Sequence, residues 1–200
     1  MFTGIIENIG IINKIQKYDN SIKLFVSSSF SLSDIKIGDS ITVNGVCLTV
    51  SDFSDNDFIF DVVKETLDVT NLKFLHNDSQ VNLERSMLLS SRIDGHIVQG
   101  HVETVGEIVD IKVFEDQTEL YIKIGDEYLK YCIHKGSIAI DGVSLTIADI
   151  NKNIIKVAII PYTLKNTILN TLKVGGIVNI ETDMLSKYVE KMIDKKEFNV

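Results

Sequence analysis

A long internal repeat constrains the fold of this chain more than any other feature of its sequence. Residues 40–50 read SITVNGVCLTV, and residues 137–147, at an offset of 97, read SIAIDGVSLTI. The same offset pairs KETL at 64–67 with PYTL at 161–164, and VNLE at 81–84 with VNIE at 178–181. Three blocks in one register indicate that the two halves of the chain are copies of one unit.

The beginning of each copy is displaced by one residue from this register. Gly4–Gly10 matches Gly100–Gly106 at an offset of 96. A period of this length is too long for a solenoid repeat and suits a small autonomous domain. We therefore expect two tandem domains, at residues 1–93 and 94–182, with the boundary near Ser90–Gly95.

Each copy is predicted to consist of short strands, because runs rich in Ile, Val, Thr and Phe are broken by Asn, Asp, Gly or Ser. The predicted strands are Ile22–Val26, Ser40–Thr49, Phe58–Val63 and Gln80–Leu83, then Leu120–Ile124, Ser137–Ile147, Ile154–Ile160 and Ile177–Ile180. One short helix per copy is expected at Thr66–Phe74 and Thr163–Leu172. This density of short strands predicts an all-β fold, either a small closed barrel or a sandwich.

A helix without a counterpart in the first copy is expected at residues 183–197, within a third segment at 183–200. Its apolar residues recur at the spacing of one helical face, while charged residues occupy the other: Met184, Leu185, Tyr188, Val189, Met192 and Ile193. The helix packs either on its own barrel or against another subunit, and the pattern favours neither.

Charge and hydropathy limit the classes of partner. The 200-residue chain has 20 Lys and Arg against 28 Asp and Glu, and the formal charge of -8 disfavours nucleic acid as a partner. No apolar run approaches the roughly 18 residues that span a bilayer, and no basic segment precedes an apolar one at the N-terminus. We expect a cytoplasmic protein that does not bind membranes. Cys47 and Cys132 are expected to be free thiols.

Signatures of several large enzyme classes are absent from the sequence. The chain contains no GxGxxG after a predicted strand, no GxxxxGK[ST], no HExxH and no paired CxxC, so neither nucleotide-phosphate chemistry nor a metal site is predicted. GVSLT at 142–146 superficially resembles a nucleophile elbow. Its last position is Thr, however, and no strand-to-helix turn is predicted there, so a serine hydrolase is disfavoured.

Three residues each allow two interpretations. His96 and His101 are five residues apart, which in an extended strand points them to opposite faces and argues against a joint metal site. Either histidine is explained by a hydrogen bond near a barrel rim, or His101, in a segment with two glycines, supplies a donor or proton-transfer group. Cys47 is either an inert buried thiol or a reactive one. Its repeat mate is Ser144, which suggests two similar sites with different tasks.

Six blocks of sequence together carry a specific family resemblance. They are MFTGI at 1–5, NGVCLT at 44–49, KETL at 64–67, GHIVQGHV at 95–102, DGVSLT at 141–146 and NIE at 179–181. Over essentially its whole length the chain resembles the riboflavin synthase alpha-chain family, which binds lumazine. The resemblance implies two tandem six-stranded Greek-key β-barrels, followed by a C-terminal α-helix that builds a homotrimer.

The resemblance also implies a transferase reaction, the last step of riboflavin biosynthesis. Two molecules of 6,7-dimethyl-8-ribityllumazine dismutate, one giving a four-carbon unit to the other, to yield riboflavin and 5-amino-6-ribitylamino-uracil. The productive pair is expected between the first barrel of one subunit and the second barrel of a neighbour. No cofactor or metal is expected, and lumazine synthase is a possible further partner.

By the same resemblance, catalytic roles are expected for Ser144, Thr146 and His101 in the second pocket and for Cys47 and Ser40 in the facing one. Asp183 is either catalytic or the N-cap of the final helix. Lys135 is expected to contact the ligand, at the ribityl chain. Tyr162 stands where His or Glu is expected. The remaining predicted contacts are Gly4, Ile5 and Ile6; Cys47, Leu48 and Thr49; Asp61, Val62, Val63, Lys64, Glu65 and Thr66; Gly100, His101 and Val102; Ser144, Leu145 and Thr146; and Ala158, Ile159, Ile160, Pro161, Tyr162 and Thr163.

Two rival hypotheses are kept beside the enzyme. One is a lumazine- or flavin-binding antenna protein of the same family, which typically loses the polar residues of one barrel. The presence of Cys47 together with His101, Lys135, Ser144 and Thr146 favours the enzyme. The other is a small-barrel interaction protein unrelated to flavins, which the -8 charge and the lack of interleaved Arg and aromatic residues disfavour.

Overall fold

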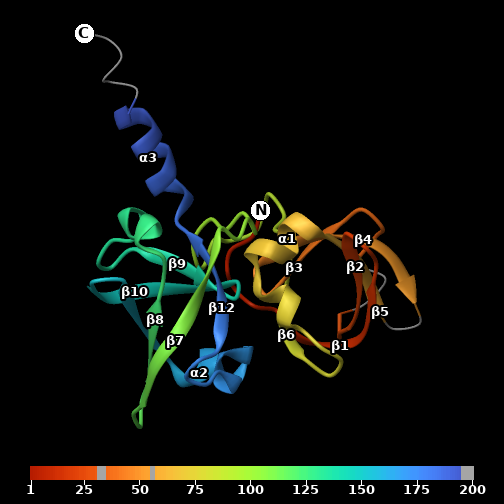
Figure 1. Cartoon of the computed structure of the whole chain (residues 1–200), viewed down its shortest axis with the longest axis horizontal. Coiled ribbons are helices and arrows are strands. Elements are labelled where there is room, and N and C mark those ends of the chain that lie inside the picture. Colours follow the sequence, from red (N-terminus) through yellow and green to blue (C-terminus); the bar gives the residue numbers. More distant parts are fainter. Residues whose placement is uncertain (31–34, 55–56, 195–200) are drawn as a thin grey trace.

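The computed structural model describes residues 1–30, 35–54 and 57–194. Two closed six-stranded antiparallel β-barrels lie side by side, and a helix projects away from the second barrel (Figure 1). The predicted all-β class, with two six-stranded barrels and a C-terminal helix, is confirmed.

The two barrels have the same strand order around their circumference. The first runs β1-β2-β5-β4-β3-β6, and the second follows the same cycle as β10-β11-β8-β7-β12-β9. The elements of the first barrel are β1 (Asn8–Lys17), β2 (Ser21–Ser27), β3 (Ser40–Val43), β4 (Val46–Ser54), β5 (Asp57–Val63), α1 (Lys64–Val69), η2 (Asn71–Phe74) and β6 (Gln80–Arg85). Those of the second are β7 (Thr104–Val113), β8 (Thr118–Lys123), η3 (Asp126–Tyr131), β9 (Ser137–Ile140), β10 (Val143–Asn151), β11 (Ile154–Ile159), α2 (Pro161–Lys165), η4 (Ile168–Thr171) and β12 (Ile177–Thr182).

The prediction of one continuous strand at Ser40–Thr49, and of another at Ser137–Ile147, is wrong. Each run is a tight hairpin, β3–β4 or β9–β10. The turns are Asn44-Gly45 and Asp141-Gly142, and all four of these residues have positive φ, between 45° and 80°. Asn-Gly and Asp-Gly are the residue pairs that such hairpin turns favour, so the signal was present in the sequence.

Strands β1 and β7 were not predicted from their own residues. Each is ten residues long and contains a register shift, between Ile12 and Lys14 in β1 and between Ile108 and Asp110 in β7. A bulge of this kind interrupts the alternation of inward and outward side chains, and this alternation is the pattern by which a strand is recognised.

The single helix predicted after β5, and again after β11, is in each barrel divided into an α-helical and a 3-10 segment. The division falls at Thr70 and Thr167, whose backbones are extended. Each threonine hydroxyl donates to a carbonyl four residues earlier and accepts from the amide two residues later, at Leu72 or Leu169. The threonine side chain therefore ends one helix and caps the next.

Each barrel has its own apolar core, and a third small cluster joins them. Phe2, Val98 and Ala139 are buried together between the barrels, with Cys47 packed against them. Phe2 and Val98 exchange two backbone hydrogen bonds, of 2.7 and 3.1 Å. The chain segments before β1 and before β7 therefore pair with each other at the junction.

Four asparagine and aspartate side chains form a buried, nearly symmetric network at this junction. Within the first barrel the backbone amide of Asn82 donates to the side chain of Asn44, and within the second the backbone amide of Asn179 donates to the side chain of Asp141, both at 2.8 Å. Between the barrels, Asn82 Nδ2 donates to the Asp141 carbonyl at 2.9 Å and Asn179 Nδ2 to the Asn44 carbonyl at 2.8 Å. The barrels are thus held in one relative orientation by reciprocal hydrogen bonds.

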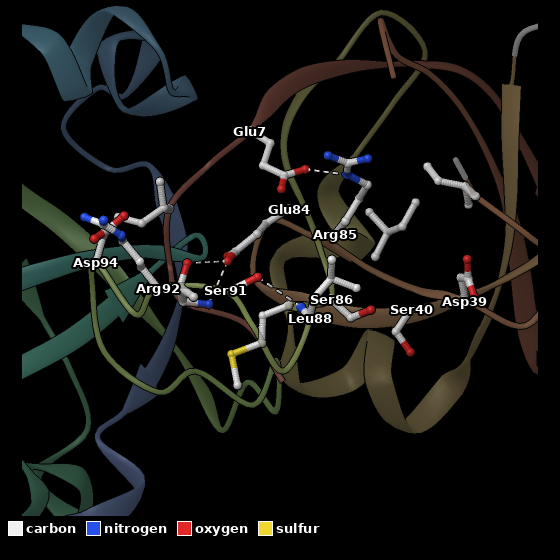
Figure 2. Close-up of a pocket in the computed structure, with 15 residues that line it drawn as sticks. Glu7, Asp39, Ser40, Glu84, Arg85, Ser86, Leu88, Ser91, Arg92 and Asp94 are labelled. Atoms are coloured by element: carbon white, nitrogen blue, oxygen red, sulfur yellow. Dashed lines mark hydrogen bonds and ion pairs between the residues drawn. The ribbon is translucent and has the colours of Figure 1, made fainter. Parts of the chain in front are cut away.

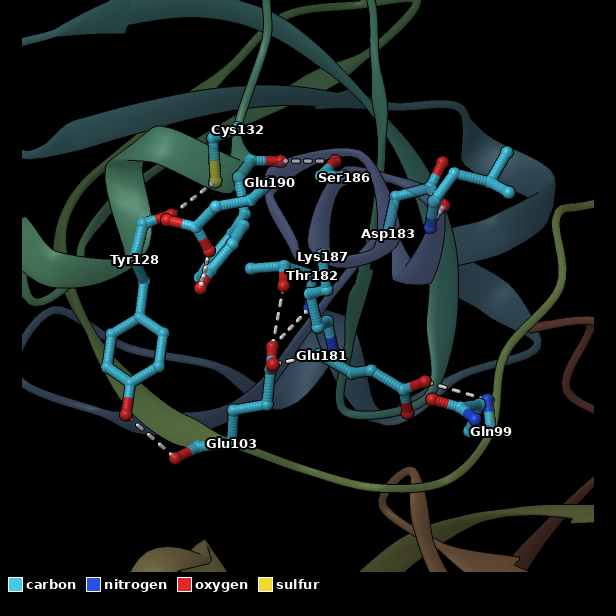
Figure 3. Close-up of polar contacts among 12 residues, drawn as sticks. Gln99, Glu103, Tyr128, Cys132, Glu181, Thr182, Asp183, Ser186, Lys187 and Glu190 are labelled. Carbon is cyan, nitrogen blue, oxygen red and sulfur yellow. Dashed lines mark hydrogen bonds and ion pairs between the residues drawn. The ribbon is translucent and has the colours of Figure 1, made fainter. Parts of the chain in front are cut away.

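Helix α3 (Met184–Asp194) packs on the second barrel with its polar face (Figure 3). Lys187 pairs with Glu103, Ser186 Oγ donates to the Tyr131 carbonyl, and Glu190 contacts Lys130 and the Tyr131 hydroxyl. The apolar face is left exposed: Leu185, Tyr188, Val189, Met192 and Ile193. Positions 195–197 of the predicted helix lie outside the described residues. Within the described ranges, no helix is long and apolar enough to cross a membrane.

Candidate functional site

Two matched surface sites lie on the outer faces of the β3–β4 and β9–β10 hairpins. Ile41 and Leu48 are opposite each other and belong to the first core, so the residues that alternate with them, Ser40, Cys47 and Thr49, face outward. The same alternation in the second barrel sends Ser144 and Thr146 outward, with Ser137 opposite Thr146. Thr49 and Thr146 are exposed, and Ser40, Cys47 and Ser144 are half-buried.

In the first site, the segment Gly100–Val102 lies against the β4 strand. The Cys47 amide donates to the Gly100 carbonyl at 2.8 Å, and Val102 packs on the first core. Strand β5 is hydrogen-bonded to β4, so the predicted contacts Asp61–Thr66 follow the neighbouring strand into helix α1. The structure therefore brings three predicted contact segments together on the first barrel.

In the second site, the segment Gly4–Ile6 lies against β10. The Ser144 amide donates to the Gly4 carbonyl at 2.8 Å, and Ile6 packs on the second core. The predicted contacts Ala158–Thr163 run along β11, beside β10, and into α2. Each site is thus built from a hairpin of one barrel and the segment that leads into the other barrel.

The structure places His101 differently from the prediction. His101 was expected to share the second pocket with Ser144 and Thr146. In the single chain it directly follows Gly100, which is bonded to Cys47, so it lies at the first site. Its repeat mate at the second site is Ile5. His96 and His101 do not lie on one extended strand, because Val98 forms an isolated β-bridge and Gly100 has a φ of 80°.

The close approach at each site requires glycine. Gly4 and Gly100 have φ values of 75° and 80°, and a Cβ on either would lie 2.6 Å from the Cβ of Ser144 or Cys47. No L-residue side chain fits that space without moving the hairpin. Residues 3–6 and 99–102 are called the crossing segments here, because each lies on the hairpin of one barrel and leads into the other barrel. The two glycines therefore set how closely the crossing segments lie on the two sites.

Two buried carboxylates that were given no role from the sequence fix the crossing segments. Glu84 accepts hydrogen bonds from the Thr3 amide and hydroxyl and from the Gly4 amide, at 2.6 to 3.0 Å. Its repeat mate Glu181 accepts from the Gln99 and Gly100 amides at 2.7 and 2.9 Å (Figure 3). Burial raises the pKa of both carboxyls, and these hydrogen bonds oppose the rise. Glutamate at matched ends of two strands was the signal that could have identified them.

His96, for which no catalytic role was assigned, contacts the second site directly. Its Nδ1 lies 2.7 Å from Ser144 Oγ, and its backbone amide donates to the Thr3 carbonyl at 3.1 Å. Burial lowers the pKa of this imidazole, and the nearby Asp183 carboxylate raises it by a smaller amount. Asp183 Oδ1 also accepts from the Leu185 amide at 3.0 Å, so it does cap α3. Asp183 therefore lies at the start of α3 and also acts electrostatically on His96.

The two sites differ at matched positions around a shared frame. The first has Cys47, Lys64, Glu65 and His101 where the second has Ser144, Pro161, Tyr162 and Ile5. Exposed apolar side chains accompany both: Val63 at the first site, and Ile5, Ile160 and Tyr162 at the second, each between 45% and 75% exposed. Flat apolar surface beside hydroxyl groups suits a heteroaromatic ring with polar substituents.

A cavity of about 610 Å³ adjoins Ser40 on the first barrel (Figure 2). Ser40 and Glu84 line it, together with Ile5 from the crossing segment, and the Glu7–Arg85 ion pair of 2.7 Å forms part of its wall.

Lys135 lies in the turn before β9 with a φ of 66°, and its amide donates to the Ile147 carbonyl at 2.8 Å. It therefore lies near the end of the Ser144–Thr146 segment, with its side chain exposed.

Cys47 and Cys132 are both free, as predicted. Cys132 is buried, and burial raises the pKa of its thiol to about 11, so it stays protonated and unreactive. Within the described residues, no cluster of three or more His, Cys, Asp or Glu side chains could hold a metal ion.

Comparison with known proteins identifies both halves of the chain. The Lumazine binding domain family matches residues 3–86 and again residues 99–183. Riboflavin synthase of Actinobacillus pleuropneumoniae is 46% identical over 196 residues, which cover 98% of this chain and 91% of that protein. Riboflavin synthase of Bacillus subtilis (strain 168) is 41% identical over 199 residues, which cover 100% of this chain and 93% of that protein.

A solved structure extends the likeness to a ligand complex. The crystal structure of LumP complexed with 6,7-dimethyl-8-(1'-D-ribityl) lumazine superimposes with a TM-score of 0.82 at 31% identity. The match covers 92% of this chain and 99% of that one.

Proposed function

The chain belongs to the riboflavin synthase family of tandem lumazine binding domains, and from this membership we propose that it is a riboflavin synthase. The proposed reaction is the dismutation of two molecules of 6,7-dimethyl-8-ribityllumazine. One molecule gives a four-carbon unit to the other, and the products are riboflavin and 5-amino-6-ribitylamino-uracil. Atoms and electrons balance between the two substrates and the two products, so the reaction needs no external oxidant or reductant.

The observation that carries this proposal is the presence of two matched but unlike sites in one chain. The frame is the same in both, with a glycine carbonyl bonded to the amide of Cys47 or Ser144. The side chains around it differ, since His101 and Lys64 at the first site correspond to Ile5 and Pro161 at the second. Two copies of one substrate bound in such sites meet different environments, so one becomes donor and the other acceptor.

Positioning supplies most of the catalysis in this proposal. Loss of a proton from the 7-methyl group of the substrate leaves an anion that is delocalised through the ring, so the acid–base demand is modest. Holding two flat rings face to face at near-attack distance contributes on the order of 7–11 kcal/mol in favourable intramolecular cases. The half-buried Ser40, Cys47 and Ser144 supply polar groups beside the rings.

We propose that the reacting pair forms between the first barrel of one subunit and the second barrel of a neighbour, in a homotrimer. The support is the exposed apolar face of α3, because the polar face of that helix is already used against its own barrel. The cytoplasmic location and an association with lumazine synthase stay predictions.

The test is incubation of the purified chain with 6,7-dimethyl-8-ribityllumazine and no added cofactor, with both products followed by chromatography. One riboflavin formed for every two lumazines consumed is the expected result. Lumazine bound but unchanged would contradict the proposal and favour an antenna protein, a function for which the likeness to the LumP complex is the specific observation. Absence of binding would overturn both.

A further inference from the structure

We propose that His96 is a positioning residue of the second site, which holds the Ser144 hydroxyl with its oxygen lone pairs turned toward the substrate. This inference rests on the proposed function. It adds a residue and a pH dependence that neither the family match nor the repeat pattern assigns.

The geometry singles out this histidine among those of the described chain. Its Nδ1 lies 2.7 Å from Ser144 Oγ, which is within ordinary hydrogen-bond distance. The backbone on either side is fixed, since the His96 amide donates to the Thr3 carbonyl and Val98 pairs with Phe2. Gly95 lies so close that a Cβ there would be 2.2 Å from the Thr3 carbonyl oxygen and 2.8 Å from Ser144 Cβ. The imidazole is therefore held against Ser144 by the crossing segments.

The direction of this hydrogen bond depends on which ring nitrogen of His96 carries the proton. The pKa of His96 is lowered by burial, so the ring is neutral at pH 7, and one nitrogen accepts while the other donates. Asp183 is the charged group that acts on this ring among the described residues. The proposed positioning role places the ring proton on Nε2. Nδ1 then accepts the Ser144 hydroxyl proton, and the lone pairs of Oγ remain free to accept from a ligand.

Protonation of His96 would reverse this arrangement. An imidazolium donates from both nitrogens, so Nδ1–H would point at Ser144 Oγ and occupy a lone pair. Ser144 could then no longer accept from the substrate in the same way. Turnover should therefore decline as pH falls through the pKa of His96, below the ordinary histidine range near 6.5.

The first test is a double-mutant cycle on lumazine turnover. His96→Ala is expected to lower kcat about 10-fold or more, because the Ser144 hydroxyl loses the partner that orients it toward the substrate. In a Ser144→Ala background the same change should lower kcat less than about 2-fold, since the partner hydroxyl is already gone. Additive losses would overturn the inference.

The second test separates positioning from a merely structural role. His96→Asn places a neutral side-chain oxygen or nitrogen where Nδ1 was, so it can keep the hydrogen bond but cannot titrate. It is expected to retain most of the turnover at pH 7.5 and to lose the decline on the acid side of the profile. An unchanged acid limb in His96→Asn would contradict the inference.

His134→Asn is the matched control, because His134 is an exposed histidine on the same barrel. It should leave both kcat and the pH profile unchanged.

Thermal unfolding of every variant reports whether a loss of turnover comes from misfolding. If His96→Ala is less stable, comparison within the Ser144→Ala background still allows the cycle to be interpreted. Wild-type protein that forms no riboflavin would overturn the proposed function together with this inference, whereas turnover with an additive cycle would overturn the inference alone.

Discussion

The two copies of the repeat differ at single residues, and the proposed function gives these differences separate tasks at the two sites. Cys47 and Ser144 occupy the same position on matched hairpins, each bonded through its amide to a glycine carbonyl. We expect Ser144→Ala to lower lumazine turnover by about 10-fold or more without unfolding the chain, because it removes a polar group that faces outward from the barrel. Ser27→Ala, which removes a half-buried hydroxyl from β2 of the first barrel, is the control and should leave the rate unchanged. Equal rates for wild type and Ser144→Ala would remove Ser144 from the site.

A second single-residue difference lies in the buried network between the barrels. Asp141 is the mate of Asn44, and only Asp141 accepts a further hydrogen bond, from Asn71 Nδ2 at 2.8 Å. The mate of Asn71 is Ile168, which has no side-chain donor. Among the described residues, Asp141 Oδ2 is the buried side-chain atom left without a partner. The acid Asp141 therefore occurs where the opposite barrel supplies the side-chain amide of Asn71. The amide Asn44 occurs where the opposite barrel supplies the apolar side chain of Ile168.

Burial of Asp141 predicts a pH-dependent stability. It raises the pKa from its ordinary 3.8 to about 7, so the folded chain keeps a proton that the unfolded chain releases between these values. The free energy of unfolding should therefore fall as pH rises from about 4 to about 7, by up to about 4 kcal/mol, and then stay level. Asp141→Asn should abolish this component, so that urea denaturation shows it more stable than wild type at pH 8 and similar at pH 4.

The reciprocal variant provides the control for Asp141. Asn44→Asp places a carboxylate opposite Ile168, with no amide to receive. It should destabilise the chain at pH 8, and the loss should shrink as pH falls toward 4. Parallel pH profiles for wild type and Asp141→Asn would show that the buried carboxyl does not titrate in this range.

At the scale of elements, the hairpins and the crossing segments are the units that build the sites. The repeat predicted two related domains, yet nothing in it indicated that the segment before each barrel lies on the other barrel. That arrangement depends on long-range contacts, with Glu84 holding Thr3 and Gly4, and Glu181 holding Gln99 and Gly100. Apolar periodicity reports burial along one element and carries no information on which distant segment covers it.

The crossing segments can be tested through their glycines. Gly100 and Gly38 both have positive φ, 80° and 95°, but a Cβ at 100 meets Cys47 at 2.6 Å whereas one at 38 meets nothing within 4 Å. Gly38→Ala should cost about 1–2 kcal/mol of unfolding free energy from the backbone alone. Gly100→Ala should cost more, and it should weaken lumazine binding, because the segment bearing His101 must move away from Cys47. Equal losses of stability for the two variants, with unchanged lumazine binding, would show that the close approach is unimportant.

The candidate sites show what sequence can and cannot supply at this scale. The segments that carry the family resemblance are the ones that the fold assembles around Cys47 and Ser144. The sequence allowed a hydrogen bond for His96 near a barrel rim, but it did not identify Ser144 as the partner, because the two residues are 48 positions apart. The left-handed backbone of Gly100 ends the extended segment, so His96 and His101 belong to different sites. Gly100 ends the extended backbone locally, and the resulting separation of the two histidines is visible only in the contacts of this segment with Thr3 and Cys47.

At the scale of the whole molecule, α3 has the reverse of the usual arrangement for an amphipathic helix. Its charged side chains contact the second barrel and its apolar side chains face solvent. The sequence left open whether the helix packs on its own barrel or against another subunit, and the structure of one chain shows the polar face docked. An exposed stripe of five large apolar residues is unfavourable in water, so burial against another copy is the expected outcome.

This stripe allows the proposed assembly to be tested separately from the fold of the barrels. Leu185→Glu combined with Val189→Glu places two charges on the apolar face, and both positions are more than half exposed in the single chain. The barrels should therefore fold as before, and each should still bind lumazine. Sedimentation should show monomers in place of trimers, and turnover should fall to background, because the proposed reacting pair spans two subunits.

The control for the helix variant is Lys191→Glu, which changes charge at an exposed position of α3 outside the apolar stripe. It should leave both assembly and turnover unchanged.

If Leu185→Glu/Val189→Glu became monomeric and still formed riboflavin at the wild-type rate, the two sites of one chain would be sufficient. The duplicated fold would then be a complete enzyme in itself, and α3 would serve assembly alone. Loss of turnover together with retained lumazine binding would instead require that donor and acceptor sites come from different subunits. This outcome would explain why a chain with two sites also carries an apolar helical face that its own barrels do not cover.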